Sequence, residues 1–255
     1  MMNQTLMQLM ALGLVLVAAV AFAIYGMRYR NQSPATRSVP VFPSLADEVG
    51  RVAEEGASIH VALGNGSLIG EDAMTSVAAL QGLSALIDLS AVYDTPPLIT
   101  TSDPTLYLLA GDWMRRAYRR LGSADLYRSV AVQFTATSPT TYAAMAATYV
   151  SDGGIGSNIV LGAFTQEVTL LTTAAEKRGL HSSGGTTSPQ GLGALYPALD
   201  QEQLVMGEDM FSGSVAVSQR SSATASLWAQ NVLRWLVIIG IVGGALISLI
   251  GVGGA

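Results

Sequence analysis

The sequence predicts an α/β fold: a doubly wound, mainly parallel, Rossmann-like sheet, flanked at both ends of the chain by a transmembrane helix. Three observations lead to this prediction. Apolar runs typical of strands alternate with helical patterns through the middle of the chain. A long apolar segment without charges lies near each terminus. All 18 acidic residues lie between these two segments, as expected for a domain that faces water.

The first apolar segment, Leu6 to Tyr25, is twenty residues long, and Gln8 is its most polar member. At about 1.5 Å per residue it covers about 30 Å, the thickness of a bilayer's hydrocarbon core. The tripeptide Ala21-Phe22-Ala23 resembles a signal-peptide cleavage site, so a cleaved signal peptide is the alternative. No basic residue precedes the segment and Arg28 follows it closely, which favours an uncleaved anchor.

The second apolar segment runs from about Trp235 to Val252, with no charge after Arg234. Arginines flank the two segments only on their inner sides, at Arg28, Arg30, Arg37, Arg220 and Arg234. The positive-inside rule therefore predicts that the domain faces the cytoplasm from the plasma (inner) membrane, with both termini outside. Membrane lipid is then an expected partner.

Small residues recur every four positions in the second segment, at Gly240, Gly244 and Ser248. This spacing lets helix backbones approach closely, and it predicts packing between the two segments or between subunits. The alternative is that glycine is simply common in membrane helices.

We divide the chain into four parts. A first transmembrane helix with a short outer tail covers 1–27, and a proline-containing linker covers 28–45. The acidic α/β domain covers 46–220. An amphipathic helix that continues into the second transmembrane helix covers 221–255.

Within the domain, each strand-like run ends at a turn and leads into a helix. Strands are expected at 59–63, 97–101, 130–136 and 158–164. Helices are expected at 72–92, 104–121, 140–150 and 166–178. A weaker fifth unit covers 180–199, and 200–220 shows no clear pattern. The strands are continuous apolar runs, which is typical of a parallel sheet covered on both faces.

Composition excludes several chemistries. The chain has no cysteine, so disulfides, zinc–thiolate sites and thiol catalysis are excluded. Between Ser44 and Ser218 there are 18 acidic and 8 basic residues, a formal net charge of −10, which argues against nucleic-acid binding. No metal site and no cofactor is predicted.

The carboxyl ends of the strands are where doubly wound folds bind ligands. Gly64, Gly66 and Gly70 follow the first strand and precede a helix, so their backbone could hold a small anion such as phosphate. The alternative is a tight structural turn, because Glu71 and Asp72 lie where the anion would approach. The residues that we predict to bind ligand are Gly64, Asn65, Gly66, Ser67, Gly70, Ser102, Asp103, Ser138 and Glu167.

No known catalytic motif is present: the sequence contains no P-loop, no G-x-S-x-G and no S-x-x-K. His60 lies inside an apolar strand and is expected in the core. His181, near Ser182 and Ser183, could act as a general base. Five carboxylates could converge on a site or bind a hard cation: Asp103, Glu167, Asp200, Glu208 and Asp209. Asp103 before Pro104 is more simply a helix N-cap.

Four arginines crowd one predicted helix, at Arg115, Arg116, Arg119 and Arg120. The simplest interpretation is a solvated helix face on which Asp112 pairs with Arg116. The alternative is a contact with an acidic partner, a neighbouring copy of the chain or anionic lipid.

The chain resembles a family of prokaryotic membrane proteins that is described as a domain of unknown function. The likeness rests on Ile59-His60-Val61-Ala62-Leu63-Gly64, Asp103-Pro104, Arg115-Arg116-Ala117-Tyr118, Ser138-Pro139, Leu161-Gly162-Ala163-Phe164 and the run from Ser226 to Arg234. It covers about 58–238, and it implies a membrane-anchored α/β domain without implying an activity.

Three functions follow as hypotheses. The first is a non-catalytic scaffold or assembly subunit, either as a homo-oligomer or with other membrane subunits. The second is a membrane-tethered domain that binds or senses a nucleotide or small anion. The third is a hydrolase that uses His181 or the carboxylates.

Overall fold

The computed structural model describes residues 39–122, 124, 127 and 131–218, with isolated helical positions at 13, 17, 20, 24, 234, 235, 237 and 238. Apart from those positions, both predicted transmembrane segments lie outside the described residues. The same holds for Gly240, Gly244 and Ser248 and for the predicted helix that leads into the second segment.

Six parallel strands form one sheet in the order β3-β2-β1-β4-β5-β6. The strands are β1 (Ser58–Gly64), β2 (Leu98–Thr101), β3 (Val132–Phe134), β4 (Ile155–Ala163), β5 (His181–Thr186) and β6 (Leu204–Met206). This is the strand order of dinucleotide-binding domains, and it confirms the predicted parallel, Rossmann-like α/β sheet. The order reverses between β1 and β4, which makes the carboxyl ends of these two strands the topological switch point.

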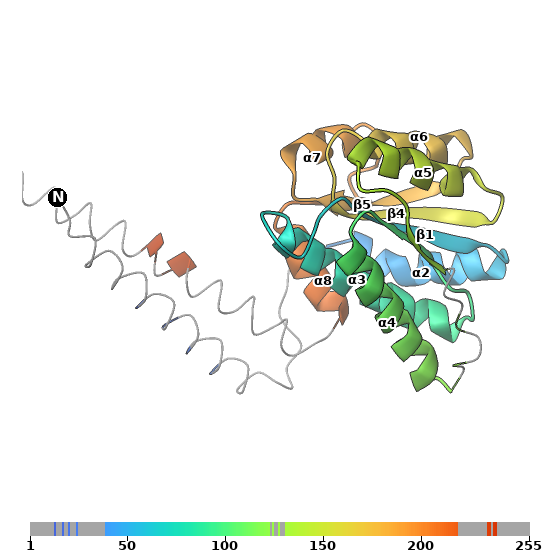
Figure 1. Ribbon diagram of the computed structural model, residues 1–255, viewed down its shortest axis with the longest axis horizontal. Coiled ribbons are helices and arrows are strands. Elements are labelled where there is room, and N and C mark those ends of the chain that lie inside the picture. The colour runs from blue at the N-terminus through green and yellow to red at the C-terminus, as the bar shows by residue number, and fades with distance from the viewer. Residues whose placement is uncertain are drawn as a thin grey trace, which may run out of the picture. The chain divides into compact units, whose positions relative to one another are not determined.

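Helices cover both faces of the sheet (Figure 1). One face carries α2 (Val41–Glu54), α3 (Ala73–Val92), α4 (Pro104–Arg120) and α8 (Asp209–Ser218). The other carries α5 (Pro139–Ser151), α6 (Val168–Lys177) and α7 (Pro189–Leu195). Each crossover between parallel strands contains a helix, as this topology requires.

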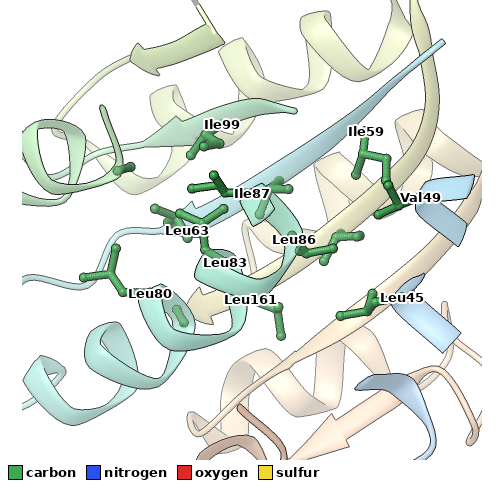
Figure 2. Packing of buried hydrophobic residues seen from close by; sticks show 14 of the residues in the cluster. Leu45, Val49, Ile59, Leu63, Leu80, Leu83, Leu86, Ile87, Ile99 and Leu161 are labelled. Carbon is green, nitrogen blue, oxygen red and sulfur yellow. The ribbon is translucent and has the colours of Figure 1, made fainter. Parts of the chain in front are cut away.

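The larger core lies between the sheet and α3. Leu83 and Ile87 of α3 lie toward the strand side chains Leu63 and Ile99, and all four are essentially inaccessible to water (Figure 2). Among the described helices, α3 alone is long and apolar enough to cross a membrane, but 72% of its apolar window is buried inside the protein. Its apolar character is therefore that of a helix enclosed by the core.

The expected extended linker over 28–45 is wrong in its last residues, because α2 already begins at Val41. Pro40 occupies the N-cap and Pro43 the first turn, where a missing N–H breaks no intrahelical hydrogen bond. Leu45, Val49 and Val52 then bury one side of the helix.

Residues 200–220, which show no clear pattern in the sequence, contain β6 and α8. Gly213 of α8 lies directly against the ring of Phe42 in α2, because a Cβ atom placed on Gly213 would be 2.1 Å from Phe42 Cε2. The first and last helices of the domain are therefore neighbours.

Candidate functional site

At the switch point, β1 and β4 approach each other too closely for side chains. Gly64 has a φ of 76°, and a Cβ atom placed on it would lie 2.2 Å from the carbonyl oxygen of Ala163. A Cβ on Gly66 would lie 2.5 Å from Ser76 Oγ and 2.8 Å from Ala163 Cβ. Backbone conformation and packing thus account for both glycines, as in the tight structural turn weighed from the sequence.

Two loops meet above this turn through the carboxylate of Glu167. Asn65, which follows β1, donates from Nδ2 to Glu167 Oε1 at 2.6 Å. The backbone N–H of Thr165 donates to the same oxygen at 2.8 Å, and the Thr165 hydroxyl donates to Oε2. Glu167 is only 9% exposed, so these donors replace most of its hydration. The hydrogen bond from Asn65 joins residues that are 102 positions apart in sequence.

Two buried polar atoms at the switch point, Asn65 Oδ1 and Ser76 Oγ, have no hydrogen-bond partner among the described residues. Ser76 is completely buried and faces Gly66 from the first turns of α3. Close by, the hydroxyls of Thr75 and Thr187 lie 2.5 Å apart and connect the start of α3 to the loop after β5. Buried polar atoms in native proteins normally have hydrogen-bond partners, so the unpartnered Asn65 Oδ1 and Ser76 Oγ call for an explanation.

The carboxyl edge of the sheet is acidic. The carboxylates that follow strands or begin helices there are Glu71, Asp72, Asp103, Glu167, Glu208 and Asp209. Across the described ranges, no lysine or arginine lies in a loop that follows a strand. An approaching anion would meet negative charge, so this edge does not favour the small anionic ligand that we expected.

The other predicted ligand-binding residues lie at different distances from this point. The backbone N–H of Ser102 donates to Gly64 O at 3.2 Å, so Ser102 belongs to the switch point. Asp103 is the N-cap of α4, with Oδ1 2.9 Å from the N–H groups of Thr105 and Leu106. The remaining three residues have local roles in turns and helix caps. Ser67 Oγ accepts a hydrogen bond from Ile69 N, Gly70 has a φ of 106°, and Ser138 is the exposed N-cap of α5.

A buried hydrogen-bond chain runs beneath the switch point, on the face of the sheet covered by α5. Gly64 N donates to the Tyr142 hydroxyl, which contacts Thr100 Oγ1; both distances are 3.2 Å. Thr100 Oγ1 lies 3.0 Å from Nε2 of His60, and Nδ1 lies 2.8 Å from Asn158 Oδ1. All donors can align in one direction from Gly64 to Asn158, and aligned hydrogen bonds strengthen one another.

Burial sets the protonation states of the two titratable groups in this hydrogen-bond chain, His60 and Tyr142. It lowers the pKa of His60 to about 4, although the hydrogen bond to Asn158 opposes the shift. It also raises the pKa of Tyr142 to about 12. Both groups are therefore neutral near pH 7, and the expected core position of His60 is confirmed. His60 contacts a hydroxyl at Thr100, but neither group is accessible to a substrate.

The second histidine lies at the opposite, amino edge of the sheet. His181 Nδ1 is 3.5 Å from Glu48 Oε1 of α2, and its Nε2 is 2.7 Å from Gln203 Nε2. Burial alone would raise the pKa of Glu48, but hydrogen bonds from Arg51 and Ser157 and the nearby His181 lower it. A cavity of about 750 Å³ lies here, and its lining includes Asp47, Glu48, Arg51, His181, Asp200, Glu202 and Gln203.

This arrangement does not support the hydrolase hypothesis. Among the described residues, no hydrogen bond joins His181 to Ser182 or Ser183, and Ser182 Oγ instead accepts from Asn158 on the other face of the sheet. The five carboxylates do not converge, since Asp200 lies at the amino edge and the others at the carboxyl edge. No group of three or more acidic or histidine side chains within the described part of the chain could hold a metal ion.

The arginine cluster of α4 is largely paired within the chain. The predicted pair of Arg116 with Asp112 is confirmed at 2.6 Å. Arg120 pairs with Asp88 at the end of α3, and the guanidinium of Arg115 lies 5.4 Å from the ring centroid of Tyr127. These contacts favour the solvated helix face over a partner surface.

Sequence reasoning missed Thr165, Ser76 and Tyr142 at this site. Thr165 stands two positions before Glu167, a spacing at which a hydroxyl and a backbone N–H can both reach the carboxylate. Ser76 and Tyr142 give no local signal, because their roles depend on how α3 and α5 pack against β1.

Comparisons with curated proteins and with solved structures find no match for this chain. A comparison with protein families matches residues 1–254, nearly the whole chain. The chain belongs to the family described as Domain of unknown function (DUF6754).

Proposed function

We propose that this protein is a membrane-tethered, non-catalytic domain that binds a small polar molecule at the switch point of its Rossmann-like sheet. The observation that carries the proposal is the convergence of Asn65 and Glu167 above the carboxyl ends of β1 and β4. In open α/β sheets, ligands bind in the crevice at this point. The unpartnered Asn65 Oδ1 and Ser76 Oγ supply polar atoms that a ligand could engage.

Three observations support tethering by both ends of the domain. Phe42 near the start of the domain packs on Gly213 near its end, so the two chain segments that lead to the predicted anchors begin beside each other. At the described helical positions of the two apolar segments, large apolar side chains are exposed, such as Val17, Ile24 and Trp235. The distribution of arginines favours a cytoplasmic domain in the inner membrane with both termini outside.

A scaffold role in a membrane assembly is the second candidate. It is favoured by the small residues at Gly240, Gly244 and Ser248, which suit close packing of helices between copies. The two proposals differ in what leaves the membrane with the protein: a bound small molecule in the first and a defined oligomer in the second.

Native mass spectrometry of the full-length protein, released from a mild detergent, tests ligand binding. We expect a small bound mass that survives desalting and disappears in Thr165→Trp, because Thr165 is exposed beside Glu167 and the indole would fill the entrance. Thr148→Trp, an equally exposed position on α5, is the matched control and should keep the mass. A mass that both variants retain would place the ligand elsewhere, and an oligomer without added mass would favour the scaffold.

The membrane arrangement has an independent test, because the chain contains no cysteine. Single cysteines at Asn3, Glu176 and Ala255 can be labelled in intact cells with a membrane-impermeant maleimide. We expect labelling of the cysteines at the two termini, and labelling of the cysteine at position 176 only after the cells are lysed. Labelling at position 176 in intact cells would show the opposite orientation.

A further inference from the structure

We infer that the switch point takes a small cationic ligand, and that its ammonium or guanidinium group replaces the amide of Asn65 on the carboxylate of Glu167. This inference rests on the proposed function, because it names the chemical class that the same site would bind.

The hydrogen-bonding groups at the site call for a donor. Glu167 presents two carboxylate oxygens that can only accept. The Ser76 hydroxyl, completely buried and without a partner among the described residues, can accept as well. A phosphomonoester dianion offers no donor from its phosphate group and inorganic phosphate dianion offers one, whereas an ammonium offers three and a guanidinium five.

The charge at the site has the same sign throughout. Glu167 is nine-tenths buried, and its two hydrogen-bond partners, Thr165 and Asn65, are neutral. The remaining charged residues that follow strands at this edge are also acidic. Within the described part of 39–218, every arginine and lysine lies in α2, in the second half of α4, or at the end of α6 and the residue after it. Two of these arginines, Arg51 and Arg178, donate to backbone carbonyls near the amino end of β4. They therefore lie at the edge of the sheet opposite to Glu167.

The internal hydrogen bond makes ligand binding a competition. Asn65 Nδ2 is a neutral donor, whereas an ammonium or guanidinium on the same oxygen adds the attraction between opposite charges to the hydrogen bond. A cation can therefore displace the amide, while a neutral molecule exchanges one hydrogen bond to the carboxylate for another of the same kind. Displacement also moves the Asn65 side chain, so that Oδ1 leaves the buried position in which it has no hydrogen-bond partner.

The test measures dissociation constants by isothermal titration calorimetry on the full-length protein in detergent, after removal of any bound molecule. The probes are agmatine and spermidine as cations, ribose as a neutral polyol, and AMP and inorganic phosphate as anions. We expect a cation to bind and Glu167→Gln to weaken it at least about tenfold, the effect of losing a charged partner. Asn65→Ala should tighten the same cation several-fold, because it removes the internal competitor.

Glu176→Gln, an exposed carboxylate of α6 at the amino edge, is the control and should leave the affinity unchanged. Equal losses in Glu167→Gln and Glu176→Gln would mean general attraction to an acidic protein and would overturn the inference. Binding of AMP or phosphate that strengthens in Glu167→Gln and vanishes in Thr165→Trp would overturn the cationic class and keep the proposed site. A cation affinity that Thr165→Trp leaves unchanged would overturn both.

Discussion

The imidazole of His60 and the amide of Asn158 contact each other on the face of the sheet that α5 covers, with 2.8 Å between His60 Nδ1 and Asn158 Oδ1. They join the neighbouring strands β1 and β4, at the pair where the strand order reverses. Because the ring is completely buried, protonating it would place a charge where water cannot reach. This makes the stability of the domain depend on pH.

We predict that the domain loses stability as the pH falls from about 6.5 to about 4. The pKa of His60 is about 4 in the folded protein and about 6.5 for an unperturbed histidine in the unfolded chain, so between these values the unfolded chain binds a proton that the folded chain does not. Its contribution is complete above pH 6.5 and decreases by about 3 kcal/mol on reaching pH 4. Thermal unfolding of the full-length protein, followed by circular dichroism across this range, measures the loss.

His60→Asn should flatten this part of the pH profile, whatever its effect on stability at pH 7. His181→Ala is the control, since His181 is partly exposed at the amino edge, and it should preserve the decline. An unchanged decline in His60→Asn would assign the pH dependence to another group.

Tyr142→Phe should lower the free energy of unfolding by about 1–3 kcal/mol at pH 7. The phenol oxygen accepts from Gly64 N at 3.2 Å and contacts Thr100, and its loss leaves a buried N–H without its partner. Tyr149→Phe, on the same helix but partly exposed, should change stability by less than about 0.5 kcal/mol. Unfolding of both variants in urea makes the comparison, and equal effects would show that the Gly64 contact contributes nothing.

The sheet was predictable because its central strands carry their own signal. In β1, the run from Ile59 to Leu63 is apolar except for His60 and ends at a glycine, which is typical of a strand covered on both sides. By contrast, β6 has three residues and no flanking pattern, so it forms only because β5 offers a parallel edge. The start of α2 was missed because prolines at 40 and 43 are typical of a linker, although they are also tolerated where a helix begins.

The candidate site was predictable only in part. The position of Asn65 after a strand marked it as a loop residue at the carboxyl edge, and Glu167 was placed at the same edge by the same reasoning. Their contact could not be predicted, because it requires β1 and β4 to be neighbours despite the two strands and three helices between them in the chain. Ser76 and Tyr142 are assigned by tertiary packing alone.

Arg178→Met should destabilise the domain by about 1–3 kcal/mol. Its Nη1 donates to the carbonyl oxygens of Val150, Asp152 and Ile155, where α5 ends and β4 begins. Lys177→Met, at the adjacent exposed position, is the control and should be nearly neutral. Hydrogen exchange should also accelerate near Ile155 in Arg178→Met, and protection that stays the same there would exclude this capping role.

Gly213→Ala should separate α2 from α8 and destabilise the domain by about 1–3 kcal/mol. The added methyl group would lie 2.1 Å from Phe42 Cε2. A Cβ atom placed on Gly82 of α3 would lie 3.5 Å from Phe42 Cε1, so α3 limits how far the ring can move away. Gly193→Ala in α7 is the matched control, because nothing lies within 4 Å of its added Cβ atom and alanine favours a helix. The double variant Gly213→Ala with Phe42→Leu should recover part of the loss if the collision is the cause. Thermal unfolding of the wild type, Gly213→Ala, Gly193→Ala and the double variant makes the comparison. Equal stability of Gly213→Ala and Gly193→Ala would show that the contact between Gly213 and Phe42 does not set the spacing of α2 and α8.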